Sequence, residues 1–498
     1  GGDGGERPAQ VRPTAKVSLA AAAAEEPPHP EDPSVARRPG WLSHPALGEA
    51  PRPRGAPEPR FWNAPVDHFA KEGAKNDTFR QKYFVNDTLY KPGGPVFFAL
   101  GGEGPATRPP TGYLTHLAGP RHALLISIEH RFYGDSVPHG NANASNLKLL
   151  TVEQALADYA AFIDWYTADA KLPEGTKWFA FGGSYPGALV SWFRQAYPEK
   201  TAGALSSSGV VNAIFDFPGF DAHIARAIGD KCAEAHRSIT AAFEAHILER
   251  GEKERQAKAL LAAPANMSDG DFFYMLADAL AMAVQYGQKS KLCNNITGLD
   301  AATASPEATM ANAAAFIKDF WGEAFAQSCF YDTACLKDPS RYTVGGTARS
   351  WRWQKCDELA YFQSAPVKAK GHGGGPSPTA LRSGLVNISY MVNQCQEVFG
   401  EGFERAKIEA ATRRVNAKFG GAKPKAHKVF YSNFGDDPWL QASVMPPRDV
   451  DKTQPYKAAH CDDCGHCMDL RDPRATDPPE LVAVRERFEG YLDAWLAE

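Results

Sequence analysis

The chain has 498 residues, of which 43% are hydrophobic and 11% aromatic, and its formal net charge is −4 at pH 7. This length and apolar content support a large core and more than one structural unit. No block of Lys and Arg stands out, which argues against a nucleic-acid partner, and no apolar run approaches the length of about 18 residues that a membrane span needs.

The first 59 residues differ in texture from the remainder. They contain twelve prolines, an alanine run and scattered charges. This composition cannot bury a core, so we expect residues 1–59 to be a disordered tail or pro-segment.

From residue 60 onward, short apolar segments alternate with helical patterns. Segment 78–86 suits an edge strand or hairpin, and segments 95–100 and 123–128 suit buried strands. A helix is predicted to start after Thr151, which forms a capping-box pattern with Gln154. Further strands are predicted at 178–181, 202–208 and 428–432, and further helices at 188–196 and 479–496. Such alternation is typical of an α/β protein with a parallel sheet.

Long alanine-rich helical segments interrupt this pattern, at 222–248, 271–286 and 306–325. We therefore predict one sheet domain in two parts, 60–213 and 385–498, with a helical cap inserted at 214–384. Between the predicted strands, Glu129 and Arg131 are expected to form a buried ion pair.

The stretch WFAFGGSYPG, residues 178–187, is the centre of the predicted sheet domain. An apolar strand ends in two glycines, and Ser184 lies at the turn before a helix, as in a nucleophile elbow. Pro186 stands where the pattern G-x-S-x-G has its last glycine, but proline is tolerated at the start of a helix because the first N–H groups have no intrahelical partner. The alternative is a turn in which Ser184 only caps the helix.

A serine nucleophile needs a histidine that takes its proton and a carboxylate that orients the histidine. In α/β-hydrolases these residues follow in the order serine, acid, histidine. Here Asp436 and Asp437 follow the strand at 428–432, and His460 and His466 lie in the next long loop. The order predicts a Ser-Asp-His triad on an α/β-hydrolase fold.

An oxyanion hole requires two backbone N–H groups. The first is expected from Tyr185, which follows the predicted nucleophile. The second is expected from Gly102 or Glu103, in the loop after the strand at 95–100. The Glu103 carboxylate also suits a substrate's α-amino group, although a loop carboxylate that bonds nearby amides is an equal alternative.

Nine separated blocks resemble the serine carboxypeptidase-like exopeptidases typified by lysosomal prolylcarboxypeptidase, dipeptidyl-peptidase II and the thymus-specific serine protease. The blocks are VDHF (66–69), GGEGP (101–105), EHRFYGDSVP (129–138), LTVEQALAD (150–158), FGGSYPGALVSW (181–192), GALSSSGVV (203–211), WRWQKCDELAYFQ (351–363), DDPW (436–439) and GHCMDLR (465–471). The resemblance implies that Ser184 is the nucleophile, Asp437 the acid with Asp436 a bystander, and His466 the base. It also implies cleavage after proline, in a closed cleft that the helical cap shapes, and no cofactor.

His460 competes with His466 because it also precedes a Cys and an Asp. Only His466 is followed by the block Met-Asp-Leu-Arg, so we favour it. The surrounding C-x-x-C-x-x-C with two histidines also resembles a zinc site. We expect a local disulfide there and no metal, because disulfides are favoured in an oxidising compartment.

Six N-x-[ST] triplets point to the secretory route, at Asn76, Asn86, Asn143, Asn266, Asn295 and Asn387. Nine cysteines fit disulfides, and the odd number leaves at least one unpaired. We expect a secreted, lysosomal or vacuolar glycoprotein that acts on peptides, with a homodimer as one option for its assembly.

The leading hypothesis is a serine exopeptidase that acts through an acyl-enzyme. Within it, Glu103 favours a dipeptidyl-peptidase slightly over a Pro-X carboxypeptidase, since the first binds an amine and the second a carboxylate. The alternatives are an esterase or lipase on the same fold and a secreted binding protein that has lost activity.

Overall fold

The computed structural model describes residues 58–71, 77–300, 303–341, 348–366, 380–445 and 454–498. The predicted tail, apart from residues 58 and 59, lies outside this range.

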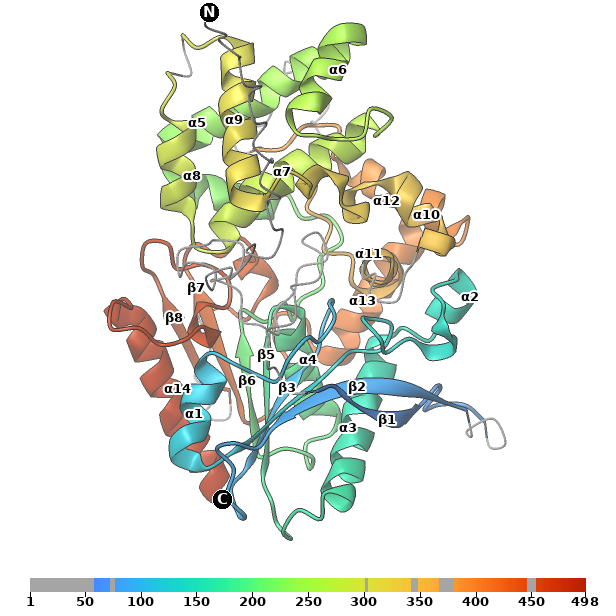
Figure 1. The fold of residues 1–498 in the computed structure, drawn as a ribbon, viewed down its shortest axis with the longest axis vertical. Coiled ribbons are helices and arrows are strands. Elements are labelled where there is room, and N and C mark those ends of the chain that lie inside the picture. Colours follow the sequence, from blue (N-terminus) through green and yellow to red (C-terminus); the bar gives the residue numbers. More distant parts are fainter. Residues whose placement is uncertain (1–57, 72–76, 301–302, 342–347, 367–379, 446–453) are drawn as a thin grey trace, which may run out of the picture.

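An eight-stranded sheet occupies the lower half of the molecule in Figure 1. Its order is β1-β2-β4-β3-β5-β6-β7-β8; the pairs β1–β2 and β2–β4 are antiparallel and the other neighbours are parallel. The strands are β1 (Arg60–Pro65), β2 (Thr78–Asn86), β3 (Val96–Leu100), β4 (Leu124–Ile128), β5 (Trp178–Gly183), β6 (Gly203–Ser207), β7 (Val429–Phe434) and β8 (Tyr456–Ala459). This is the α/β-hydrolase arrangement, as predicted.

Helices cover both faces of the sheet. The two layers consist of α1 (Tyr113–Arg121) with α14 (Pro479–Ala497), and of α3 (Val152–Asp169) with α4 (Tyr185–Ala196). In β5, Phe179 and Phe181 belong to the core under α1 and α14, and Trp178 and Ala180 to the core under α3 and α4. Burial on both faces explains why this strand is apolar throughout instead of alternating. The predicted cap of α3 is also present, since the Thr151 hydroxyl accepts a hydrogen bond from the Gln154 N–H at 3.2 Å.

The remaining helices lie mostly above the carboxyl ends of the parallel strands (Figure 1). They are α5 (Gly219–Glu249), α6 (Gly251–Leu260), α7 (Asp269–Gln285), α8 (Lys289–Ile296), α9 (Pro306–Trp321), α10 (Thr333–Lys337), α11 (Ala348–Gln354), α12 (Ile388–Phe399) and α13 (Arg405–Phe419); α2 (Ala144–Leu147) lies before α3. A π-helical turn, Lys355–Leu359, directly continues α11. A disulfide between Cys356 and Cys395 joins this turn to α12.

The predicted ion pair between Glu129 and Arg131 is wrong. Arg131 forms a bidentate pair with Asp158 of α3, at 2.7 Å for each contact. Glu129 pairs with Lys82 of β2 at 2.9 Å. Both residues lie beyond the end of β4, in an irregular segment and turn where the two-residue period of a strand no longer places positions 129 and 131 on one face, so the two side chains reach different elements.

Within the described residues, no helix combines the length and apolarity required to cross a bilayer.

We predict that Asp158→Asn destabilises the protein by about 3–5 kcal/mol, because it leaves the buried Arg131 guanidinium without its counter-charge. Both side chains have 0% exposure. Asp164→Asn is the matched control on the same helix, since the pair of Asp164 with Lys200 is exposed and is expected to contribute less than about 1 kcal/mol. Urea unfolding measures both values, and equal losses would contradict the assignment.

Candidate active site

Ser184 occupies the sharp turn between β5 and α4. Its backbone has φ 63° and ψ −128°, a strained conformation for a residue other than glycine. The flanking glycines permit the turn, because a Cβ at Gly182 would lie 2.1 Å from the Pro186 carbonyl oxygen, and one at Gly187 would lie 2.8 Å from the Gly209 Cα. The helix already begins at Tyr185, with Pro186 in its first turn. The geometry is that of a nucleophile elbow.

Asp437 and His466 form a buried pair at the carboxyl ends of the strands. His466 Nδ1 lies 2.7 Å from Asp437 Oδ2, and both side chains are at most 1% exposed. Asp437 Oδ1 accepts the Trp439 backbone N–H at 2.9 Å, which orients the carboxylate. Burial opposes a charge on the His466 ring, but Asp437 and Cys467 together outweigh burial and raise the pKa of His466 well above its usual value. The arrangement stabilises the imidazolium that forms when a histidine takes a proton.

The end of β6 brings Ser184 and the His466 loop together. The Ser207 carbonyl oxygen accepts the Ser184 N–H at 3.0 Å and the Cys467 thiol at 3.5 Å. The Ser208 hydroxyl accepts the Cys467 N–H at 3.0 Å. Among the described residues, His466 Nε2 is buried and has no hydrogen-bond partner, so this nitrogen is available to a nucleophile or substrate. It makes no hydrogen bond to the Ser184 hydroxyl, and contacts between a nucleophile and its base often tighten only when substrate binds.

The loop after β3 lies directly on the elbow. A Cβ at Gly102 would lie 2.4 Å from Pro186 Cγ and 3.5 Å from Tyr185 Cδ1, so only glycine permits this approach. The two segments from which we predicted the oxyanion donors are therefore in contact.

Glu103, the next residue of this loop, is 8% exposed. Burial raises the pKa of its carboxyl to about 7, although its own backbone N–H and the charge of His466 lower it. Its charge also raises the pKa values of Tyr185 and Tyr361, in both cases after the larger effect of burial. Glu103 is therefore a buried, titratable carboxylate within electrostatic reach of His466.

The two alternatives to the triad residues have other environments. Asp436 forms an ion pair with Lys289 of α8 at 3.0 Å. His460 is exposed and follows β8. Cys461 and Cys464 form a disulfide, which confirms the predicted local bridge. Within the described part of the chain, no group of three or more His, Cys, Asp or Glu side chains is arranged to hold a metal.

All nine cysteines lie within the described residues, and eight of them form four disulfides. The other pairs are Cys232–Cys293, Cys329–Cys335 and Cys356–Cys395. Cys467 is free and buried, as expected from the odd number.

Residues of the helical insertion complete the site, and the sequence patterns did not identify them individually. The Gln285 carbonyl oxygen accepts the His466 N–H at 2.6 Å, and its side-chain oxygen accepts the Trp439 indole N–H at 3.0 Å. Gln285 thus joins the histidine loop to the acid loop. No sequence motif identifies Gln285, because its contacts with the two loops depend on where the end of α7 lies in the folded protein.

An aromatic wall adjoins the elbow. The Tyr185 ring centroid lies 5.3 Å from that of Trp351, and Tyr361 lies 6.5 Å from Trp351 and 5.8 Å from Trp439. Trp351 and Tyr361 belong to the block at 351–363, so only the resemblance gave a signal for this segment.

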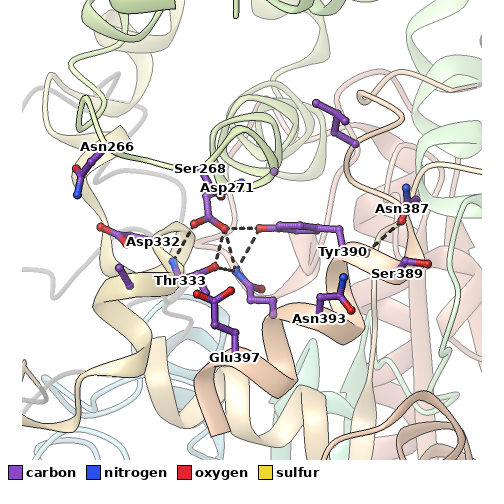
Figure 2. A pocket seen from close by; sticks show the side chains of 14 residues that line it. Asn266, Ser268, Asp271, Asp332, Thr333, Asn387, Ser389, Tyr390, Asn393 and Glu397 are labelled. Atoms are coloured by element: carbon purple, nitrogen blue, oxygen red, sulfur yellow. Dashed lines mark hydrogen bonds between the residues drawn. The ribbon is translucent and has the colours of Figure 1, made fainter. Parts of the chain in front are cut away.

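A separate cavity of about 500 Å³ lies among α7, α10 and α12 (Figure 2). Asp271 accepts hydrogen bonds there from the Tyr390 hydroxyl at 2.6 Å and the Thr333 hydroxyl at 2.7 Å. Asn266 and Asn387 both line the cavity, from opposite sides in Figure 2, and the predicted catalytic residues do not.

Of the other predicted glycosylation sites, Asn143 and Asn295 are exposed and Asn86 is half-buried at the end of β2. Asn76 lies outside the described residues.

Comparison with known proteins gives consistent results. The model of the family Serine carboxypeptidase S28 matches residues 64–488. Similar proteins include the probable serine protease EDA2 of Arabidopsis thaliana, 31% identical with 88% of each chain covered, and the thymus-specific serine protease of Mus musculus, 28% identical with 91% of each covered. The lysosomal Pro-X carboxypeptidase of Homo sapiens is 25% identical, again over 88% of each chain.

We predict that Glu103→Gln becomes more stable, compared with the unsubstituted protein, as the pH rises. The quantity compared is the free energy of unfolding of the two proteins at each pH. The folded pKa of about 7 lies above the ordinary glutamate pKa of 4.5. The stabilising contribution of the protonated Glu103 carboxyl is therefore present below pH 4.5 and is lost as the pH rises through about 7. The difference is expected to grow by up to about 3 kcal/mol between these limits. Denaturant unfolding at several pH values measures it, with the exposed Glu199→Gln as control. A difference that does not change with pH would contradict the assignment.

Proposed function

The chain belongs to the Serine carboxypeptidase S28 family, and from this membership we propose that it is a serine exopeptidase whose catalytic triad is Ser184, Asp437 and His466. That the protein is a serine peptidase follows from the family itself. The observation that supports the triad is the buried 2.7 Å pair of His466 and Asp437 on the sheet edge where Ser184 occupies the elbow.

The proposed reaction proceeds through an acyl-enzyme. His466 Nε2 takes the Ser184 hydroxyl proton as the oxygen attacks the scissile carbonyl, and Asp437 holds the ring through Nδ1. The backbone N–H groups of Tyr185 and of Gly102 or Glu103 stabilise the oxyanion. His466 then gives its proton to the leaving amine, and water releases the acyl group by the same steps.

We propose that cleavage occurs after proline. The aromatic wall of Tyr185, Trp351, Tyr361 and Trp439 suits an apolar ring beside the nucleophile. The name of the human relative, a Pro-X carboxypeptidase, agrees with this chemistry.

The Glu103 carboxylate favours a dipeptidyl-peptidase. A buried anion near the nucleophile suits the α-ammonium group of a peptide with a free amino end, whereas the carboxyl end that a carboxypeptidase binds needs a cation or hydrogen-bond donor. Since burial raises the pKa of Glu103 to about 7, amine binding requires a pH near or above this value.

We propose that the protein follows the secretory route to the cell exterior or the lysosome. Four disulfides and six N-x-[ST] triplets support this. We expect occupied sites at the exposed Asn143 and Asn295, which mass spectrometry of peptides before and after enzymatic deglycosylation tests. Unmodified asparagine at all six positions in protein from the native source would contradict the glycoprotein assignment.

Substitution of the proposed triad residues is expected to abolish activity without unfolding the protein. Asp437→Asn should reduce kcat about 10⁴-fold, because the histidine then adopts the wrong tautomer. Ser184→Ala should also eliminate labelling by a fluorophosphonate. His460→Ala is the matched control for His466→Ala and should retain full kcat, since His460 is exposed; loss of activity in the control would reject the triad.

A pair of substrates distinguishes the two exopeptidase classes. We expect release of fluorophore from an Xaa-Pro substrate with a free amine, and no cleavage of a blocked peptide that ends in Pro-Phe. For the first substrate, kcat/KM should fall below pH 7 as Glu103 is protonated, and Glu103→Gln should raise KM at pH 8. The opposite preference would assign a carboxypeptidase, and cleavage of neither substrate would reject proline specificity.

A further inference from the structure

We infer that Gln354, a residue of the helical insertion, positions Tyr185 so that the Tyr185 backbone N–H points into the oxyanion hole. This inference rests on the proposed function, because it assigns a role to the residue that follows the nucleophile. It makes the insertion a part of the catalytic machinery as well as a cover over the cleft.

The contact between Gln354 and Tyr185 is direct and buried. Gln354 Nε2 donates to the Tyr185 hydroxyl at 2.7 Å, and the Tyr133 hydroxyl donates to Gln354 Oε1 at 2.5 Å. Gln354 is 0% exposed and Tyr185 is 1% exposed. Water cannot replace either bond, so the amide of Gln354 is fixed at both ends.

The groups around the Tyr185 hydroxyl fix the direction of both of its hydrogen bonds. His130 Nδ1 lies 2.7 Å from the Arg131 carbonyl oxygen, so Nδ1 carries the proton and donates it. Burial lowers the pKa of His130 to about 4, which leaves Nε2 as an acceptor at neutral pH. The Tyr185 hydroxyl therefore donates to His130 Nε2 at 3.1 Å and accepts from Gln354.

Tyr185 needs such an anchor because of its neighbours in the chain. The proline that follows disfavours the helical conformation of the preceding residue, yet α4 begins at Tyr185. Ser184 on its other side has a positive φ. A Cβ added to Gly102 would lie 2.4 Å from Pro186 and 3.5 Å from the Tyr185 ring, so a rotation of Tyr185 would disturb both segments of the proposed oxyanion hole.

The segment that carries Gln354 is itself rigidly held. Gln354 ends α11, the π-helical turn follows at once, and Ala360 and Tyr361 have φ values of 53° and 48°. The disulfide of Cys356 with Cys395 fixes the turn to α12. Interrupted helices and strained backbone of this kind concentrate at functional sites.

The test is a double-mutant cycle of Gln354→Met and Tyr185→Phe, which removes the hydrogen bond from either side and keeps the ring. We expect each single variant to reduce kcat about 10-fold or more with KM nearly unchanged, since an oxyanion donor acts mainly in the transition state. The loss of kcat in the double variant should be much smaller than the product of the two single losses, because both changes remove the same bond between Gln354 and Tyr185. The rate of labelling of Ser184 by a fluorophosphonate, whose phosphoryl oxygen occupies the oxyanion hole, should fall in parallel.

The matched control is Gln394→Met, a glutamine of α12 that is 2% exposed and contacts Thr333 rather than Tyr185. It should lower the unfolding temperature and leave kcat and the labelling rate unchanged. Effects of Gln354→Met and Tyr185→Phe that multiply, or a folded Gln354→Met with full kcat, would overturn the inference. If Gln354→Met does not fold, the Tyr185→Phe variant is sufficient as a test: an unchanged rate of labelling in Tyr185→Phe would by itself overturn the inference. Failure of the proposed function is distinguishable, because the unsubstituted protein would then show neither cleavage nor labelling.

Discussion

The hydrogen bonds of Ser207, at the end of β6, connect the two halves of the candidate site. Its carbonyl oxygen accepts the backbone N–H of Ser184, and its hydroxyl donates to Asp469 in the histidine loop. Asp469 also accepts the Ser432 hydroxyl of the neighbouring strand at 2.5 Å. These bonds fix three segments at adjacent positions on one edge of the sheet. The segments are the elbow, the strand that precedes Asp437 and the loop that carries His466. Because parallel strands end at the same edge, residues far apart in the chain meet there.

Buried charge is the cost of this arrangement. Glu103, Asp437 and His466 are all buried, and an isolated ion at such positions would be several kcal/mol unfavourable. The pairing of Asp437 with His466 offsets that cost, whereas for Glu103 burial outweighs the favourable effects of its own backbone N–H and of the His466 charge, so the pKa of Glu103 rises. The same desolvation strengthens every interaction with a charge that develops during reaction. A binding role for Glu103 is thus compatible with the energetic cost of burying its carboxylate.

The helical insertion contributes contacts that the sheet domain lacks. Gln285 bridges the acid and histidine loops, and Gln354 reaches the tyrosine beside the nucleophile. Both are buried, and both contact their targets through hydrogen bonds of defined direction. The contacts of the insertion therefore extend to the elbow and to the loops of the proposed acid and histidine, which couples the placement of the insertion to the geometry of the candidate site.

The amino-acid sequence by itself determined six of the eight strands, the elbow and the chain order of the proposed triad residues. Buried strands such as β5 are apolar throughout, and glycines beside Ser184 are required by close backbone contacts, so local pattern carries this information. The pairing of Asp437 with His466, instead of Asp436 with His460, was favoured only by a block resemblance, and the contact itself belongs to the tertiary structure.

Only the tertiary structure decided the partners of the buried polar groups. Arg131 lies two residues from Glu129 but pairs with Asp158, and Gln354 meets Tyr185 across 169 positions of the chain. A polar side chain inside a protein must find a partner wherever the fold provides one, and sequence distance does not limit that choice. Sequence periodicity and motifs indicate local backbone geometry and which face of a helix or strand is buried. The identity of each hydrogen-bond partner depends on how distant elements pack, and no local pattern encodes it.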